Sequence, residues 1–298
     1  RKLLRVILDF QRPTNIIDNL RWLAGFNFYD IRTGSVDIEK LNKGQSDEDK
    51  LPDVPLLYDK YVEWGLISEK EKEGGSHKFI KLGLVYDTRD NESNPSKGIW
   101  TEALLMTAPR FLGNNDFACT RFSAIHRQYF SIIKKRLIFA YRLGYQGTLD
   151  GETPFYLYPL MMSSFSTATK SDGLGGAKTL RGILRNRVIG EDVAYANLEF
   201  RWKFFRTVLW KQNLYFALIG FSDVGQACRK ISIDKSNIPE DINQDLFFGT
   251  SGESLHLSYG AGFRLALNEN FIIAIDYGFA ADGQDGSRGL YININNLF

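Results

Sequence analysis

The sequence predicts an all-β fold, a transmembrane antiparallel β-barrel, and three observations support it. Apolar and polar side chains alternate along about eleven segments. Most of these segments have ten to fifteen residues, whereas soluble sheets usually use strands of about five or six. Charges stand in the middle of the polar faces, at Asp87, Glu199, Asp223 and Asp276, while large aromatic residues gather near the ends of the apolar faces. A polar interior with aromatic girdles is typical of a membrane barrel and disfavours a soluble β-sandwich, the alternative that also alternates.

The alternation defines each expected strand in chain order. Residues 194–203 illustrate it, because every second side chain from Ala194 to Trp202 is apolar and the side chains between them, from Asn197 on, are polar or charged. The expected strands cover residues 4–11, 20–30, 79–89, 98–108, 116–131, 135–148, 194–203, 213–225, 255–265, 271–281 and 288–298.

Composition excludes several classes of protein. The formal net charge is +2 with acidic and basic residues interleaved, so we expect no nucleic-acid partner. The apolar runs are too short for a membrane-spanning helix. The 2 Cys and 3 His are scattered along the chain, and no nucleophile, base and orienting group share a recognisable spacing. We therefore expect no metal, no cofactor, no catalytic residue and no enzyme activity.

The connections give the strands a direction across the membrane. Barrels of this kind keep short turns on the periplasmic side and long loops outside. With the last strand ending in the periplasm, the long connections 33–77, 149–191 and 226–254 all fall on the outer side. The first strand would then run from outside to inside, so we expect at least one strand upstream of residue 1. Residues 1–298 are interpreted as one barrel domain whose N-terminal strands are missing.

The outer connection 33–77 also predicts a short helix. Within residues 55–67, the apolar residues Leu57, Tyr61 and Trp64 recur at helical spacing. Isolated short helices need tertiary support, so packing on the barrel rim is favoured over a docking site for a partner lipoprotein.

Four motifs in order resemble one known family. Asp87-Thr88-Arg89-Asp90-Asn91, followed by Pro95 and Gly98, resembles the strand-and-turn motif of the BamA/TamA superfamily of outer-membrane assembly and secretion barrels. Leu180-Arg181-Gly182-Ile183 resembles the family's Val-Arg-Gly-Phe motif, with Leu and Ile in the flanking positions, and residues 197–201 and 221–225 resemble its next two strand signatures.

The end of the chain carries a further resemblance. Residues 289–298, with Tyr291 and Phe298, are similar to the terminal aromatic signal for insertion of outer-membrane barrels. The simpler interpretation is a last alternating strand with Leu290, Ile292 and Ile294 toward lipid, and both interpretations can hold together.

The resemblance implies an architecture and a function. The family barrel has sixteen strands, five of them after the motif loop, so the strands here would be the sixth to the sixteenth and about five would lie upstream. It implies a non-enzymatic protein of the Gram-negative outer membrane that assembles, inserts or translocates outer-membrane proteins. Expected partners are outer-membrane lipids, unfolded barrel clients and periplasmic or surface lipoproteins. A passive channel or a membrane anchor for a partner protein is the alternative.

The connection 149–191 is expected to fold into the barrel. A guanidinium out of water costs several kcal/mol unless it is paired, and the alternation places Glu199 and Asp223 on the polar faces of adjacent strands. In the resembled family the motif arginine meets these two acids. We therefore predict a lumen cluster of Arg181, Gly182, Glu199 and Asp223, in which Gly182 permits a tight backbone. The alternative is a solvated surface loop in which Arg181 is one of several basic residues.

Overall fold

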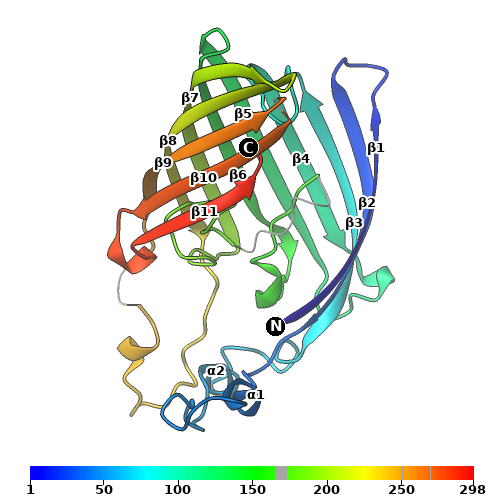
Figure 1. Cartoon of the computed structure of the whole chain (residues 1–298). Helices are drawn as coiled ribbons and strands as arrows, with labels where there is room; N and C mark the ends of the chain where they lie inside the picture. The colour runs from blue at the N-terminus through cyan, green and yellow to red at the C-terminus, as the bar shows by residue number, and fades with distance from the viewer. Residues whose placement is uncertain (165–172, 250–251, 269) are drawn as a thin grey trace.

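The computed structural model describes residues 1–164, 173–249, 252–268 and 270–298. In these residues, eleven antiparallel strands form one curved sheet whose spatial order is the order of the sequence (Figure 1). The strands are β1 (Lys2–Pro13), β2 (Leu20–Arg32), β3 (Gly74–Asp87), β4 (Gly98–Ala108), β5 (Cys119–Ile133), β6 (Leu137–Gly151), β7 (Asp192–Leu209), β8 (Gln212–Arg229), β9 (His256–Leu267), β10 (Phe271–Ala280) and β11 (Arg288–Ile294). The predicted all-β barrel fold is confirmed, and β1 and β11 are the two edges of the described sheet.

Two short helices lie in the connection between β2 and β3. Helix α1 spans Ile38–Asn42, where Asp37 caps the first turn by accepting a hydrogen bond from the Lys40 amide. Helix α2 spans Leu57–Glu63, inside the residues for which the sequence predicts a helix. No helix among the described residues is both long enough and apolar enough to cross a membrane.

The two faces of the sheet differ as the two-residue period requires. On β7, Leu198, Phe200 and Trp202 are 44–53% exposed, while Glu199 and Arg201 between them are at most 2% exposed. Aromatic rings cluster on the exposed face near the start of β6 and in the second half of β7, and the centres of Phe139 and Phe200 lie 4.9 Å apart. The exposed face is therefore the lipid-facing one, and the charged face lines the lumen.

The connection between β6 and β7 fills much of the lumen. Its first part packs Tyr156, Leu157 and Met162 against lumen-facing residues of β2 to β5, including Phe79. Its second part packs Leu174, Leu180, Ile183 and Val188 against Val193, Tyr195 and Ala227 of β7 and β8. The two largest apolar clusters among the described residues thus form between the wall and this connection, which lies inside the curve of the sheet (Figure 1).

The end of the chain differs from the expected strand 288–298. Strand β11 stops at Ile294, and Asn295 adopts a φ of +71°, which turns the last residues into the lumen. Phe298 is 6% exposed and packs against Tyr129 and Ala140. Arg201 Nη2 of β7 donates to the carbonyl oxygen of Phe298 over 2.7 Å, which holds this segment against the lumen face of the sheet.

Candidate functional site

The candidate site lies where the second part of the in-folded connection meets the wall of the lumen. Leu174 and Val188 exchange two backbone hydrogen bonds of 3.0 and 3.2 Å, which close residues 174–188 into a compact loop. Leu180 and Ile183 are almost completely buried in the apolar cluster beneath this loop. These two anchors fix Arg181 and Gly182 against the strands.

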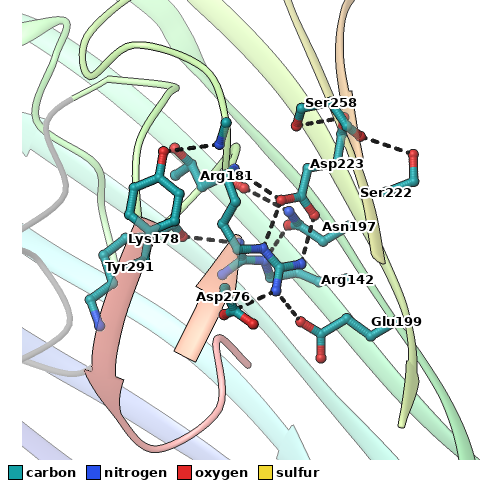
Figure 2. A network of polar contacts seen from close by, with 12 residues as sticks. Arg142, Lys178, Arg181, Asn197, Glu199, Ser222, Asp223, Ser258, Asp276 and Tyr291 are labelled. Carbon is teal, nitrogen blue, oxygen red and sulfur yellow. Dashed lines mark hydrogen bonds and ion pairs between the residues drawn. The ribbon is translucent and has the colours of Figure 1, made fainter. Parts of the chain in front are cut away.

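Arg181 is bound on several sides by carboxylates of the wall (Figure 2). Its Nε and Nη2 donate to the two carboxylate oxygens of Asp223 over 2.9 and 3.0 Å, and its backbone amide donates to Asp223 Oδ2 over 3.0 Å. Its Nη1 donates to Glu199 Oε1 over 2.7 Å. All three side chains are fully buried. The structure therefore brings together the residues that the sequence analysis grouped.

The site also contains charged residues that the sequence analysis did not include. Asp276 of β10 lies 3.4 Å from Arg181 Nη1 and pairs with Arg264 of β9 over 2.7 and 3.1 Å. Arg201 donates to the second carboxylate oxygen of Glu199 over 2.7 Å. Three arginines and three carboxylates thus form one buried network with a formal charge of zero. The signal for the added members was present, because the two-residue period places Asp276, Arg201 and Arg264 on the polar face.

Charge pairing outweighs burial at Arg181. Burial alone would lower the pKa of its guanidinium, but Glu199 and Asp223 raise that pKa above its ordinary value. The guanidinium carbon also lies 3.6 Å from the centre of the Phe221 ring, which adds a cation–π contact. Arg181 therefore stays charged, and its planar fork satisfies Asp223 through two parallel hydrogen bonds.

A glycine-on-glycine contact seats the loop on β10. Gly182 has a φ of +95°, and a Cβ atom there would lie 2.8 Å from backbone atoms of Phe279. On the other side of the contact, a Cβ atom on Gly278 would lie 2.9 Å from the carbonyl carbon of Arg181. Neither position has room for a side chain. The amide of Gly182 also donates to the Tyr291 hydroxyl of β11 over 2.9 Å, so the loop contacts the last two strands.

A second set of bonds holds the backbone just before Arg181. Arg142 of β6 donates to the carbonyl oxygen of Lys178 over 3.0 Å and to Asn197 Oδ1 over 2.8 Å. Asn197 of β7 in turn donates to the carbonyl oxygen of Thr179 over 2.6 Å. These side chains act as positioning residues, because they fix the direction in which the chain approaches Asp223.

The other motif residues form a separate turn between β3 and β4. Arg89 binds both carboxylate oxygens of Asp87 over 2.9 and 3.1 Å, and its guanidinium lies 4.4 Å from the centre of the Trp100 ring. Asp90 accepts backbone hydrogen bonds from residues 96 and 97, Pro95 is buried, and Gly98 has a φ of +101°. This motif fixes the turn and does not contact Arg181.

The aromatic residues of the proposed insertion signal lie in two places. The Tyr291 hydroxyl contacts the loop at Gly182, and the Phe298 ring lies 5.1 Å from the Arg201 guanidinium. Both face the lumen side of the described sheet. Among the described residues, no group of three or more His, Cys, Asp or Glu side chains could hold a metal ion.

The fold and the site define a class of protein, a transmembrane β-barrel with an arginine-anchored loop bound inside its lumen. Residues 4–298 match the Omp85 superfamily domain, and the chain belongs to this superfamily. The family resemblance of the sequence motifs is thereby confirmed.

A solved structure shows the same fold. The chain is similar to the crystal structure of BamA from Haemophilus ducreyi lacking POTRA domains 1-3, with a TM-score of 0.55 and 13% sequence identity. The similarity covers 98% of this chain and 52% of that chain, so this chain spans about half its length. A comparison with curated proteins gave no match.

Proposed function

We propose that this chain is the barrel wall of a bacterial outer-membrane protein that assembles, inserts or translocates other outer-membrane proteins. Membership of the Omp85 superfamily and the BamA-like fold support this proposal. Its partners would be unfolded barrel clients, the surrounding outer-membrane lipids and accessory lipoproteins.

The observation that carries the proposal is the short last strand. β11 has 7 residues, whereas the other ten strands have 10 to 18, and it pairs only through Arg288–Ile294 with β10 among the described residues. An edge strand presents a row of backbone N–H and C=O groups to which an extended client segment can add by β-augmentation. Its Leu290, Ile292 and Ile294 are 62–70% exposed among the described residues, so its outer face would lie toward the bilayer.

The in-folded loop contacts the same hairpin. Besides the bond from Gly182 to Tyr291, the amide of Leu184 donates to the carbonyl oxygen of Asp285 over 2.8 Å, and Arg187 pairs with the Asp285 carboxylate over 3.0 Å. We infer that the loop supports the position of the β10–β11 hairpin and thereby keeps its edge available. A loop packed in the lumen also weighs against the alternative of a wide passive channel.

Reconstitution tests the proposal. The full-length protein is placed in liposomes, a urea-unfolded small outer-membrane barrel is added, and its folding is followed by the gel-mobility difference between folded and heated protein. We expect faster client folding than in empty liposomes. Equal rates, together with large stable pores in planar bilayers, would contradict an assembly function and support a channel.

A pair of variants tests the edge. Ile292→Lys puts a charge on the lipid face of β11, while Leu218→Lys puts the same charge on the lipid face of β8, which has neighbours on both sides. The cost of the charge in lipid is similar for both variants. We expect the first variant to lose more of the acceleration than the second, and equal losses would show that the β11 edge is not the docking strand.

A further inference from the structure

A cavity of about 770 Å³ lies outside the lumen, at the end of the sheet that carries the long connections. The α2 region contributes Tyr58, Tyr61, Leu66 and Ile67, Phe155 comes from the in-folded connection, and the connection between β8 and β9 contributes Ile231, Ile233, Phe247 and Phe248. This volume falls within the range of about 300–1,000 Å³ that is usual for small-molecule sites, and the walls are mostly apolar as in such sites.

Aromatic contacts fix the walls of this cavity relative to each other. The Tyr61 ring stacks on Phe248 with 6.2 Å between centres, and Trp64 meets Phe247 edge-on at 5.1 Å. Trp64 is only 4% exposed. Helix α2 therefore packs against the β8–β9 connection through Tyr61 and through Trp64, the residue that caps its C-terminus. The cavity opens beside this contact. It is a formed hollow between two segments that are distant in sequence.

The two charged residues that line the cavity are both basic, and the nearby Glu71 carboxylate accepts a hydrogen bond from the Phe155 amide. Lys230 and Lys235 are its charged lining residues, and none of its lining residues is an Asp or Glu. Lys235 Nζ lies 4.2 Å from the centre of the Phe248 ring, so its ammonium is held at the aromatic wall. The neighbouring carboxylate of Asp234 accepts a hydrogen bond from the Ser236 amide and so stabilises the turn at residues 234–236.

We propose that this cavity binds an amphipathic anion, a molecule with an apolar chain or ring system and one carboxylate, sulfonate or phosphate group. The apolar part would occupy the walls of aromatic and branched side chains, and the anionic group would meet the two lysines. In Figure 1, α2 and the β8–β9 connection lie beyond the ends of the strands. The ligand is therefore assigned to the aqueous phase and not to the bilayer.

Photolabelling of the full-length protein in phosphatidylcholine nanodiscs tests the site. The probe is an aryl diazirine carboxylate, and its uncharged carboxamide is the matched control. We expect the carboxylate to label peptides that contain residues 58–67 and 230–249, with the carboxamide labelling them about three- to tenfold less, as loss of two exposed ion pairs implies. Equal labelling by both probes, or labelling spread over the barrel, would overturn the proposal.

Two variants distinguish labelling in the cavity from labelling on the surface around it. Ile233→Glu puts a carboxylate into the lining, and Leu246→Glu puts the same group on the same connection at a residue that is 78% exposed and outside the lining. We expect at least about tenfold weaker labelling for the first and unchanged labelling for the second, with normal heat-dependent gel mobility in both. Equal labelling of the two variants would refute the site. Competition by phosphatidylglycerol in the nanodisc would refute the aqueous origin of the ligand.

Discussion

Substitution of Arg181 by Met tests the lumen network most directly. The change keeps an unbranched side chain as far as the position of Nε but removes the guanidinium, leaving three carboxylates and two arginines in the buried network. Asp223 loses the side-chain bonds of 2.9 and 3.0 Å, whereas Glu199 keeps Arg201 and Asp276 keeps Arg264. Removing one partner of a buried ion pair costs about 3–5 kcal/mol. We expect most of this free-energy cost to arise at Asp223 and to appear as weaker docking of the loop.

Hydrogen exchange measures that cost at the loop itself. The amide of Arg181 donates to Asp223, so its protection reports docking. At about 1.4 kcal/mol per tenfold change, the substitution should lower protection of residues 174–188 by about two to four orders of magnitude. Arg185→Met is the control, because this arginine lies on the same loop and is exposed. It should lower protection far less than Arg181→Met does, because an exposed ion pair contributes at most about 1 kcal/mol.

A double substitution distinguishes a charge effect from a general loss of packing. In Arg181→Met with Asp223→Asn, the network again has equal numbers of positive and negative groups. We expect the double variant to cost about 1–3 kcal/mol less than the sum of the two single variants, the usual coupling of residues in one network. Additive costs, or equal protection in the Arg181→Met and Arg185→Met variants, would refute the role of the Arg181 pairs.

Three further predictions concern the seating of the loop. Gly182→Ala should weaken docking of the loop by about 1–3 kcal/mol, because its φ is +95° and the added Cβ would meet the backbone of β10. Faster trypsin cleavage within residues 174–188 measures this loss. Gly220→Ala is the control, because the Cβ added there has no atom within 4 Å. Tyr291→Phe removes the acceptor of the Gly182 amide and should speed exchange of that amide about fivefold, a loss of about 1 kcal/mol; an unchanged rate would contradict the bond. Asp276→Asn weakens the ion pair with Arg264, which has hydrogen bonds of 2.7 and 3.1 Å, and should lower the thermal midpoint of the barrel. An unchanged midpoint would show that Asp276 is dispensable.

The strands could be predicted because lipid and lumen impose opposite demands on alternate residues. The bounds of β4 at residues 98–108 follow directly from this alternation. The same alternation shows that Asp276 faces the lumen, but it does not show which residue lies opposite. That depends on the curvature of the sheet and on the path of the loop, because Arg181 reaches Asp276 across a sequence separation of 95 residues.

The end of the chain could not be predicted from alternation alone. Apolar and polar residues alternate up to Ile294, whereas Asn295 and Asn296 are both polar and Leu297 and Phe298 are both apolar, so the alternation does not place these last residues. The structure ends the strand because Asn295 takes a left-handed conformation, which Asn tolerates better than most residues. The last residues are held in the lumen by the hydrogen bond from Arg201 and by the ring contact between Phe298 and Tyr129. Neither partner is near Phe298 in the sequence.

The sequence separations within the lumen network constrain the order in which the barrel forms. From Arg181, Glu199 is 18 residues away and Asp223 42, while Tyr291 is 109 residues from Gly182. Contacts of such separation require large loops to close first, which makes them slow to form. The loop can therefore reach its full protection only after the β10–β11 hairpin is in place. In a refolding experiment, the Gly182 amide would gain protection after the amides of β10 and β11, and its protection would report that this hairpin is in place.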